Sequence, residues 1–177
     1  MNTCFKDEEI NSILNFRCPR YNELPSVFLY KDQVILYIEE VLRPLNIDTN
    51  ERIITPTMLN NYVKQRIVSP PKNKKYDVRH VAYLIVVCLL KQIYSLSDIC
   101  KLINIQIETF SIEEAYDFFC VELELALKCA FTDNAIMKPS TAKKYSVESE
   151  LVRSCVISLS HKLFINKYLN KQTTSIN

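Results

Sequence analysis

Amide and basic side chains gather between Thr55 and Arg79, and nucleic-acid binding is the chemistry that they could perform. Asparagine can form two hydrogen bonds with the major-groove edge of adenine, and lysine can reach guanine or a phosphate. The candidates for base or groove contacts are Asn60, Asn61 and Lys64. The candidates for phosphate contacts, which fix register and carry no sequence code, are Arg66, Lys72, Lys74, Lys75 and Arg79. The alternatives are that the two asparagines cap or solvate a helix and that the lysines belong to a solvated turn.

A helix should position the amide side chains. Thr55 is able to cap a helix, and Pro56 suits the first helical position. The apolar side chains that then share one helical face are Met58, Leu59 and Tyr62. The amides and Lys64 are left mostly on the other side of this helix.

A short basic hairpin should position the lysines. Ser69-Pro70-Pro71 cannot continue a helix, because proline has no N–H and its ring clashes with the preceding turn. The segment from Ile67 to Tyr76 is therefore expected to form a hairpin whose tip carries the lysines. Tyr62 and Tyr76 are expected to pack this hairpin against the helix. A polar-faced helix followed by a basic hairpin is the plan of a winged nucleic-acid reader.

The charges along the chain are segregated. The formal net charge is only +2. Residues 51–105, however, carry nine basic and three acidic side chains, whereas residues 106–131 carry one basic and six acidic ones. The positive excess lies on the candidate reader, as phosphate binding requires.

The composition argues against several classes of enzyme. Glycine is absent, so a P-loop or a Rossmann phosphate turn is not available in its standard form. The only two histidines, His80 and His161, lie near no second cluster of ligand types, and His80 is expected to be a satisfied core or surface imidazole. Sequence spacing does not test for a Ser-His-Asp arrangement, but no nucleophile motif is present. We expect no enzymatic activity, no cofactor and no metal site.

The seven cysteines stand singly and form no CxxC pair, which is typical of free thiols in a reducing cytoplasm. No apolar run approaches the roughly 20 residues that span a bilayer, and the acidic N-terminus has no apolar signal core. A cytoplasmic location without a membrane is therefore expected.

Hydrophobic periodicity predicts helices through most of the chain. The expected helices cover Asp7–Phe16, Leu29–Leu42, Val78–Ile93, Ser95–Ile103, Ser111–Phe131 and Val147–Leu169, in addition to the one that follows Thr55. Val78–Ile93 is apolar on nearly all sides and should be the central buried helix. The expected class is all-α with a small β wing.

The residues from Met58 to Ile103 resemble the MerR family of bacterial regulators. The resemblance lies in an apolar pair, a polar pair, a tyrosine, a short apolar strand, a proline, a basic hairpin ending in tyrosine, a long helix and a further helix opened by Ser95-Leu96-Ser97-Asp98-Ile99. It implies a MerR-like winged helix-turn-helix. Arg66 and Lys72 stand where that pattern has glycines, Asn60 replaces an arginine, and the spacer before Thr55 is longer.

A longer string, covering most of residues 24–130, resembles an uncharacterised bacterial family, the domain of unknown function eighteen thirty-six. That family is itself thought to be MerR-like. The resemblance implies a fold and no activity. The expected organisation is an N-terminal extension over 1–23, a MerR-like winged helix domain over 24–110 and a C-terminal helical region over 111–177.

These observations favour a DNA-binding transcriptional regulator that docks on duplex DNA. MerR relatives pair through a long C-terminal helix, so the resemblance implies a homodimer formed through Val147–Leu169 or Ser111–Phe131. The alternative is a non-enzymatic helical adaptor between proteins that keeps the MerR-like fold without binding DNA. The acidic helix from Ser111 and the missing arginine favour the adaptor.

Overall fold

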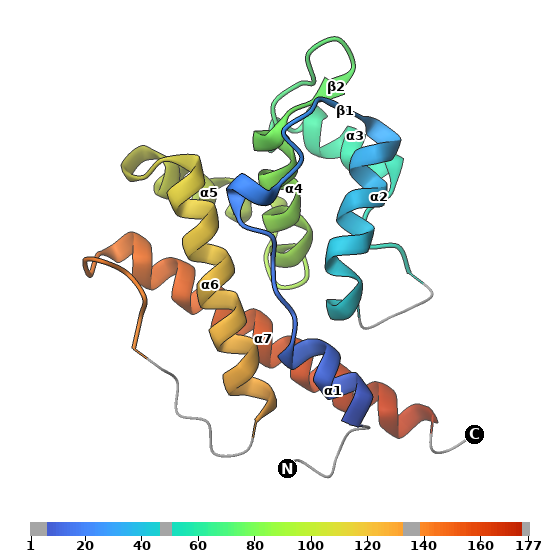
Figure 1. Ribbon diagram of the computed structural model, residues 1–177, viewed down its shortest axis with the longest axis vertical. Helices are drawn as coiled ribbons and strands as arrows, with labels where there is room; N and C mark the ends of the chain where they lie inside the picture. The colour runs from blue at the N-terminus through green and yellow to red at the C-terminus, as the bar shows by residue number, and fades with distance from the viewer. Residues whose placement is uncertain (1–6, 47–50, 133–138, 175–177) are drawn as a thin grey trace. The chain divides into compact units, whose positions relative to one another are not determined.

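The computed structural model of the protein describes residues 7–46, 51–132 and 139–174, which are mostly helical with one small antiparallel sheet (Figure 1). This confirms the expected class at the level of helices and strands. The chain divides into two compact units. We call residues 19–117 the central unit, and residues 1–18 together with 118–177 the terminal unit. The three regions expected from the sequence stay a prediction.

The central unit is built around α4, Val78–Leu90, of whose 13 residues nine are buried. This helix contacts α2 (Lys31–Leu42), α5 (Leu96–Thr109) and β2 (Lys75–Tyr76). The prediction of a buried helix here is confirmed. It ends at Leu90 rather than Ile93, because the next residues turn and the amide of Ile93 donates to the carbonyl of Leu90.

Polar caps start the helices of the central unit as expected. The hydroxyl of Thr55 accepts a hydrogen bond from the amide of Met58 at 3.2 Å and begins α3, Pro56–Lys64. Ser95 caps α5, and Ser111 accepts from the amide of Glu114 at the start of α6, Ile112–Phe131. Helix α5 runs on to Thr109, beyond its expected end at Ile103, since neither proline nor glycine interrupts residues 104–109. Two short 3-10 helices complete the unit, η1 (Tyr21–Glu23) and η2 (Arg43–Leu45).

The small sheet differs from the expected hairpin. β2 pairs with β1, Leu29–Tyr30, so that Leu29 lies opposite Tyr76 and Tyr30 opposite Lys75. The prediction that Ile67 begins a strand of the same hairpin was wrong. The amides of Ile67 and Val68 both donate to the carbonyl of Tyr62, which closes α3 and leaves no N–H groups there for a ladder. Helix α2 accordingly starts at Lys31, two residues later than expected.

Three residues other than glycine adopt the left-handed backbone conformation: Arg66 (φ 58°), Asn73 (φ 52°) and Lys74 (φ 63°). Arg66 closes α3, because its amide donates to Val63 and that of Ile67 donates to Tyr62, the pair of bonds that defines a Schellman motif. Asn73 and Lys74 are the central residues of a turn closed by a 3.0 Å hydrogen bond from the Lys75 amide to the Lys72 carbonyl. Two consecutive positive φ angles are those of a type I′ turn. We call Lys72–Lys75 the lysine turn.

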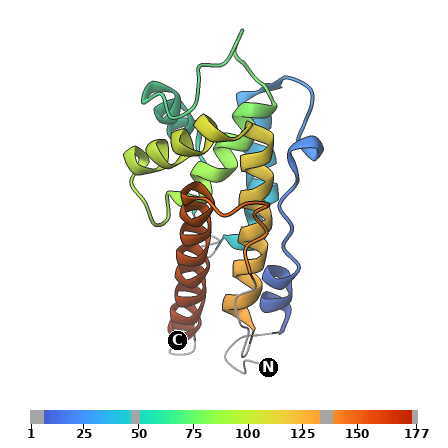
Figure 2. The ribbon, with the colours of Figure 1, turned by 90° about the vertical axis from the view of Figure 1, so that its left-hand side faces the viewer.

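The terminal unit contains α1 (Asp7–Leu14), the second part of α6 and α7 (Val147–Thr174). The rings of Phe131 and Phe164 meet edge to face with centroids 5.4 Å apart, which packs α7 against α6 (Figure 2). Helix α7 continues beyond its expected end at Leu169, because no breaking residue follows.

Glu122 of α6 is fully buried in the terminal unit. Its Oε1 accepts hydrogen bonds from the amide and the hydroxyl of Thr141, at 2.6 and 2.7 Å, while Oε2 has no hydrogen-bond partner among the described residues. This carboxylate therefore ties the segment before α7 to α6. Glu122 stands three residues after the buried Phe119 and four before the buried Ala126, so the three share one face of α6.

Replacing a left-handed residue by glycine should stabilise the central unit. The left-handed conformation costs an L-residue about 1–2 kcal/mol, and glycine avoids this cost. Glycine loses more chain entropy on folding, which cancels about 0.5–1 kcal/mol of the gain. Arg66→Gly and Lys74→Gly should each raise the free energy of unfolding in urea by about 0.5–1 kcal/mol. Gln65→Gly is the control, since Gln65 has a φ of −82° and should lose stability on the same change. A loss of stability at Arg66 would contradict the assignment.

Candidate nucleic-acid interface

Helix α3 presents its polar residues to solvent. Leu59 and Tyr62 are buried, whereas Asn60, Asn61 and Lys64 are exposed, as the helical spacing indicated. The Oδ1 atom of Asn61 accepts a hydrogen bond from Nε2 of Gln65 at 3.1 Å, one turn further along the helix. The exposed face of α3 therefore offers two amides and one ammonium group to a ligand.

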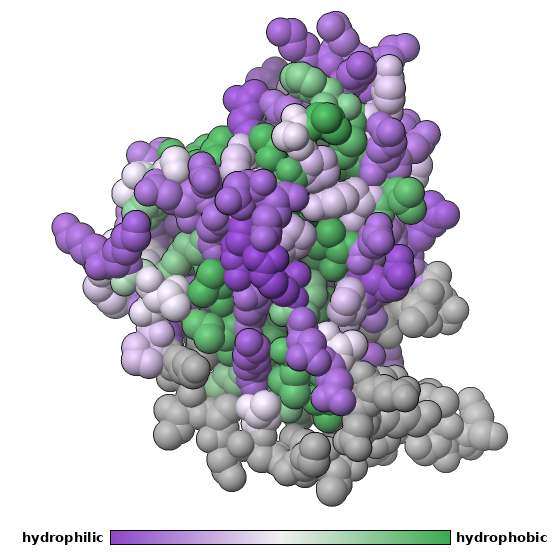
Figure 3. Space-filling view, in the orientation of Figure 1, coloured by the Kyte–Doolittle hydropathy of each residue, from purple (hydrophilic) through white to green (hydrophobic). Residues whose placement is uncertain are grey.

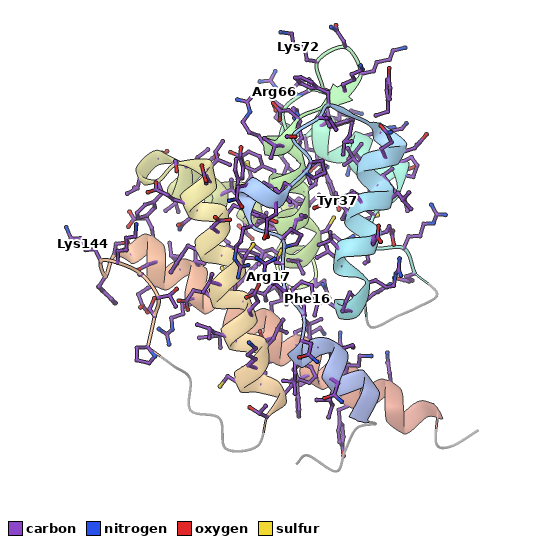
Figure 4. All side chains as sticks on the ribbon, in the orientation of Figure 1. Phe16, Arg17, Tyr37, Arg66, Lys72 and Lys144 are labelled. Atoms are coloured by element: carbon purple, nitrogen blue, oxygen red, sulfur yellow. The ribbon has the colours of Figure 1, made fainter. Side chains whose placement is uncertain are left out.

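The lysine turn carries positive charge at the end of the central unit. Lys72 and Lys74 are exposed, and Lys72 lies at the tip of the loop (Figure 4). Lys75 is partly buried, with its ammonium nitrogen 5.1 Å from the centroid of the Tyr30 ring. Figure 3 shows hydrophilic side chains covering this end of the unit. Arg66 is also exposed, directly after α3.

Helix α3 and the lysine turn lie at the same end of the central unit in both views (Figures 1 and 2). The sequence that forms them, residues 52–76, contains six basic side chains and no acidic one. The closest acidic residues along the chain are Glu51 and Asp77, which flank the stretch. This stretch therefore carries an excess of positive charge, which attracts phosphate groups.

Arg79 differs from the other candidate phosphate contacts, because it is already paired. Its Nη2 lies 2.7 Å and its Nε 3.1 Å from Oδ2 of Asp77. Burial by itself raises the pKa of Asp77, but hydrogen bonds from Arg79 and His80 outweigh it and lower that pKa to about 2. Arg79 thus reaches a phosphate only by leaving or sharing this carboxylate.

His80 is buried and hydrogen-bonded on both ring nitrogens, which confirms the expectation of a satisfied imidazole. Its exposed fraction is 6%. Nδ1 lies 2.6 Å from Oδ1 of Asp77, and Nε2 lies 3.1 Å from Oγ of Ser69. The ring of Tyr76 meets it edge to face at 5.4 Å. Sequence reasoning missed this link between Ser69 and the start of α4, although Asp77 and His80 stand at the spacing of a capping box.

Tyr62 and Tyr76 are both buried, which confirms their packing role. Burial raises the pKa of each phenol above its ordinary value, so both stay neutral at physiological pH. Burial also raises the pKa of the Cys88 thiol in α4 to about 12, which makes this cysteine an unreactive apolar side chain. None of the six described cysteines forms a disulfide bond.

Residues 7–46, 51–132 and 139–174 hold no group of three or more His, Cys, Asp or Glu side chains suited to a metal ion. Within the same ranges, every helix is too short or too polar to pass through a bilayer.

Comparison with known proteins gives a family. The family model described as "Domain of unknown function (DUF1836)" matches residues 19–119, which is more than half of the chain. The chain belongs to this family, which confirms the resemblance to the domain of unknown function, whereas the resemblance to MerR regulators stays a prediction. Comparison with curated proteins and with solved structures produced no match. The matched residues contain the whole candidate interface.

The Asp77 carboxylate should make the stability of the central unit depend on acid pH. Because its pKa falls from 3.8 to about 2 on folding, its contribution is complete above about pH 4 and is lost as the pH falls through about 2. The expected loss is about 1–2 kcal/mol in the free energy of unfolding, measured by urea titration at each pH. Asp77→Asn keeps a capping side chain and should remove this part of the pH dependence. Asp98→Asn, at a fully exposed carboxylate, is the control and should change the profile less. An unaltered profile in Asp77→Asn would contradict the assignment.

Proposed function

We propose that the protein is a DNA-binding transcriptional regulator of the cytoplasm, without enzymatic activity, that docks on duplex DNA in the manner of a MerR-like winged helix. The observation that carries this proposal is the solvent exposure of Asn60, Asn61 and Lys64 at the same end of the central unit as the lysine turn. The absence of acidic side chains from residues 52–76 supports it, because nothing within that stretch repels phosphate.

The residues divide by chemistry. Lys72, Lys74 and Arg66 would contact phosphates, which supplies affinity that is independent of sequence and sensitive to salt. Lys75 can join them from its place over the Tyr30 ring, and Arg79 can do so by sharing Asp77. The amides of α3 would read base edges, adenine in particular.

Exchanging two lysines of the lysine turn for glutamate tests this proposal. Wild-type protein should bind random duplex DNA with an affinity that falls steeply as salt rises. In fluorescence anisotropy titrations, Lys72→Glu with Lys74→Glu should weaken binding at least about tenfold at low salt and reduce the salt slope by about two. Lys143→Glu with Lys144→Glu is the matched control, since it changes the net charge equally at two exposed lysines of the terminal unit. Equal losses in both double variants would reduce the interaction to a general charge effect.

A second candidate function, a helical adaptor between proteins, is favoured by apolar exposure around β1 and α2. Val27, Phe28 and Leu36 are 65%, 58% and 68% exposed. Val27 and Phe28 are consecutive, and contiguous exposed apolar side chains commonly mark protein interaction sites. Absence of duplex binding at low salt, with the lysine turn intact, would favour this adaptor over the regulator.

Self-association through α7 forms the second part of the proposal. Val147 and Ile165, exposed by 71% and 52%, are eighteen residues apart, which is five helical turns, so both lie on one side of α7. Ser154 and Ser158 lie between them on the same side and are exposed, and Leu169, 56% exposed, extends the stripe. We call these five residues the α7 stripe.

The α7 stripe and the distribution of charge along α7 suit antiparallel pairing of two copies. The first turn of α7 is acidic, with Glu148 and Glu150, and its second half carries Lys162 and Lys167. Antiparallel pairing places the acidic end of each helix near the basic half of the other. Val147 then meets Ile165 of the second copy, and the serines allow the two backbones to approach. This two-fold pairing would also match a palindromic DNA site.

Charges placed in the α7 stripe should separate the two copies. Ile165→Glu with Leu169→Glu should shift the mass measured by sedimentation equilibrium from two chains to one, because buried unpaired carboxylates oppose association. The control is Ile105→Glu with Ile107→Glu, which adds the same charges to partly exposed isoleucines of α5. A monomeric wild-type chain, or equal dissociation in the control, would contradict pairing through α7.

A further inference from the structure

Ser69, His80 and Asp77 form a hydrogen-bonded chain for which DNA docking has no use. Ser69 Oγ lies 3.1 Å from Nε2 of His80, and Nδ1 of His80 lies 2.6 Å from Oδ1 of Asp77. The serine is exposed, the histidine is 6% exposed and the side chain of the aspartate is 20% exposed. All three belong to the central unit, so the arrangement lies within one compact body.

The short contact between His80 and Asp77 places the ring proton. Nδ1 faces two groups, the carboxylate at 2.6 Å and the backbone amide of Asp77 at 3.1 Å. The carboxylate is ionised near neutral pH, because its pKa is about 2. Two acceptors at 2.6 Å need a proton between them, and a charge-assisted bond is stronger than a bond from a neutral amide. This favours the tautomer with its proton on Nδ1, in which Nε2 accepts the hydrogen bond of the Ser69 hydroxyl and the Asp77 amide does not donate to Nδ1.

We propose that Ser69 is a modification site that accepts an acyl group from an activated ester or thioester, with His80 as the general base and Asp77 as the positioning residue. The order of atoms, from hydroxyl to imidazole to partly exposed carboxylate, is the one that activates a serine nucleophile. Solvent exposure of Ser69 gives an acyl donor access to the hydroxyl. Burial of His80 fixes the orientation of the ring.

The step balances without a further reactant. Oγ of Ser69 forms a bond to the carbonyl carbon of the donor, and the bond from that carbon to the alkoxide or thiolate breaks. The leaving group departs with the electron pair. The proton of the hydroxyl passes to Nε2 of His80, which then gives it to the leaving group.

The residues after Ser69 limit the chemistry to a single acylation. Pro70 and Pro71 have no amide N–H, so neither can donate to the oxyanion that forms on attack. Loss of one oxyanion donor costs roughly 10²–10³ in rate in acyl-transfer enzymes. Hydrolysis of the serine ester passes through a second oxyanion and meets the same deficit, and it also lacks the good leaving group of the activated donor, so it is slower than the acylation. Ser69 is accordingly a residue that stays acylated after one round.

A fluorophosphonate probe tests the activation of Ser69 in the full chain. The probe forms a bond between phosphorus and Oγ and releases fluoride, so it needs the same base. Ser95 and Ser111 are internal references, because both are exposed and donate to carboxylates, Asp98 and Glu114, without an intervening histidine. Peptide mapping by mass spectrometry should find Ser69 labelled at least about tenfold faster than either reference, in line with the effect of a positioned base.

Two variants separate base catalysis from accessibility. Asp77→Asn keeps the helix cap but can donate an amide N–H to Nδ1, which favours the tautomer with its proton on Nε2. His80→Gln removes the base. Each should lower the labelling rate of Ser69 at least about tenfold while the references keep theirs, in protein whose circular dichroism shows the fold intact.

Two outcomes would overturn the proposal: labelling spread equally over exposed serines, or Ser69 labelling that both folded variants retain. If His80→Gln does not fold, the result for Asp77→Asn decides. The labelling experiment does not involve DNA, so its outcome is independent of whether the protein is a transcriptional regulator.

Discussion

The carboxylate of Asp77 connects the surface of the central unit to its core. It accepts from the amides of Arg79 and His80 at the start of α4, pairs with the guanidinium of Arg79 and holds the ring of His80. Since β2 ends at Tyr76, one residue earlier, the same group also fixes where the strand gives way to the buried helix. The loop that carries the lysines is thereby tied at one end to the most apolar element of the unit.

The features of the fold that could be predicted from the sequence are those that depend on interactions between residues close together in the chain. Thr55, Asp77, Ser95 and Ser111 each satisfy backbone amides within three residues of themselves, so their types and spacing suffice to locate helix starts. The buried face of α3 and the apolar character of α4 follow in the same way from helical periodicity. The candidate binding residues on α3 were therefore placed correctly on an exposed face, although their contact with DNA stays a prediction.

Contacts between distant residues could not be predicted from one sequence. β2 pairs with Leu29–Tyr30, more than forty residues earlier, and no local pattern announces a strand of two residues. The hydrogen bond between Ser69 and His80 depends on the reversal of the chain through two prolines and the lysine turn. The bonds from Thr141 to Glu122 join α6 to a residue nineteen positions further along the chain. In each of these three cases, the packing of the folded chain determines which residues pair, and this packing outweighs local conformational preference.

The lysine turn is preorganised for ligand binding, because Asn73 and Lys74 already have the left-handed conformation in the free protein. The turn is closed by its own backbone hydrogen bond and adjoins the pairing of β1 with β2 before any ligand arrives. An anionic partner therefore encounters a preorganised backbone and restricts only lysine rotamers, at about 0.5–1.5 kcal/mol for each immobilised side chain. A flexible loop of the same composition would in addition lose its chain entropy on binding. The conformational strain already present in the free protein thus lowers the entropy that binding of an anionic ligand would cost.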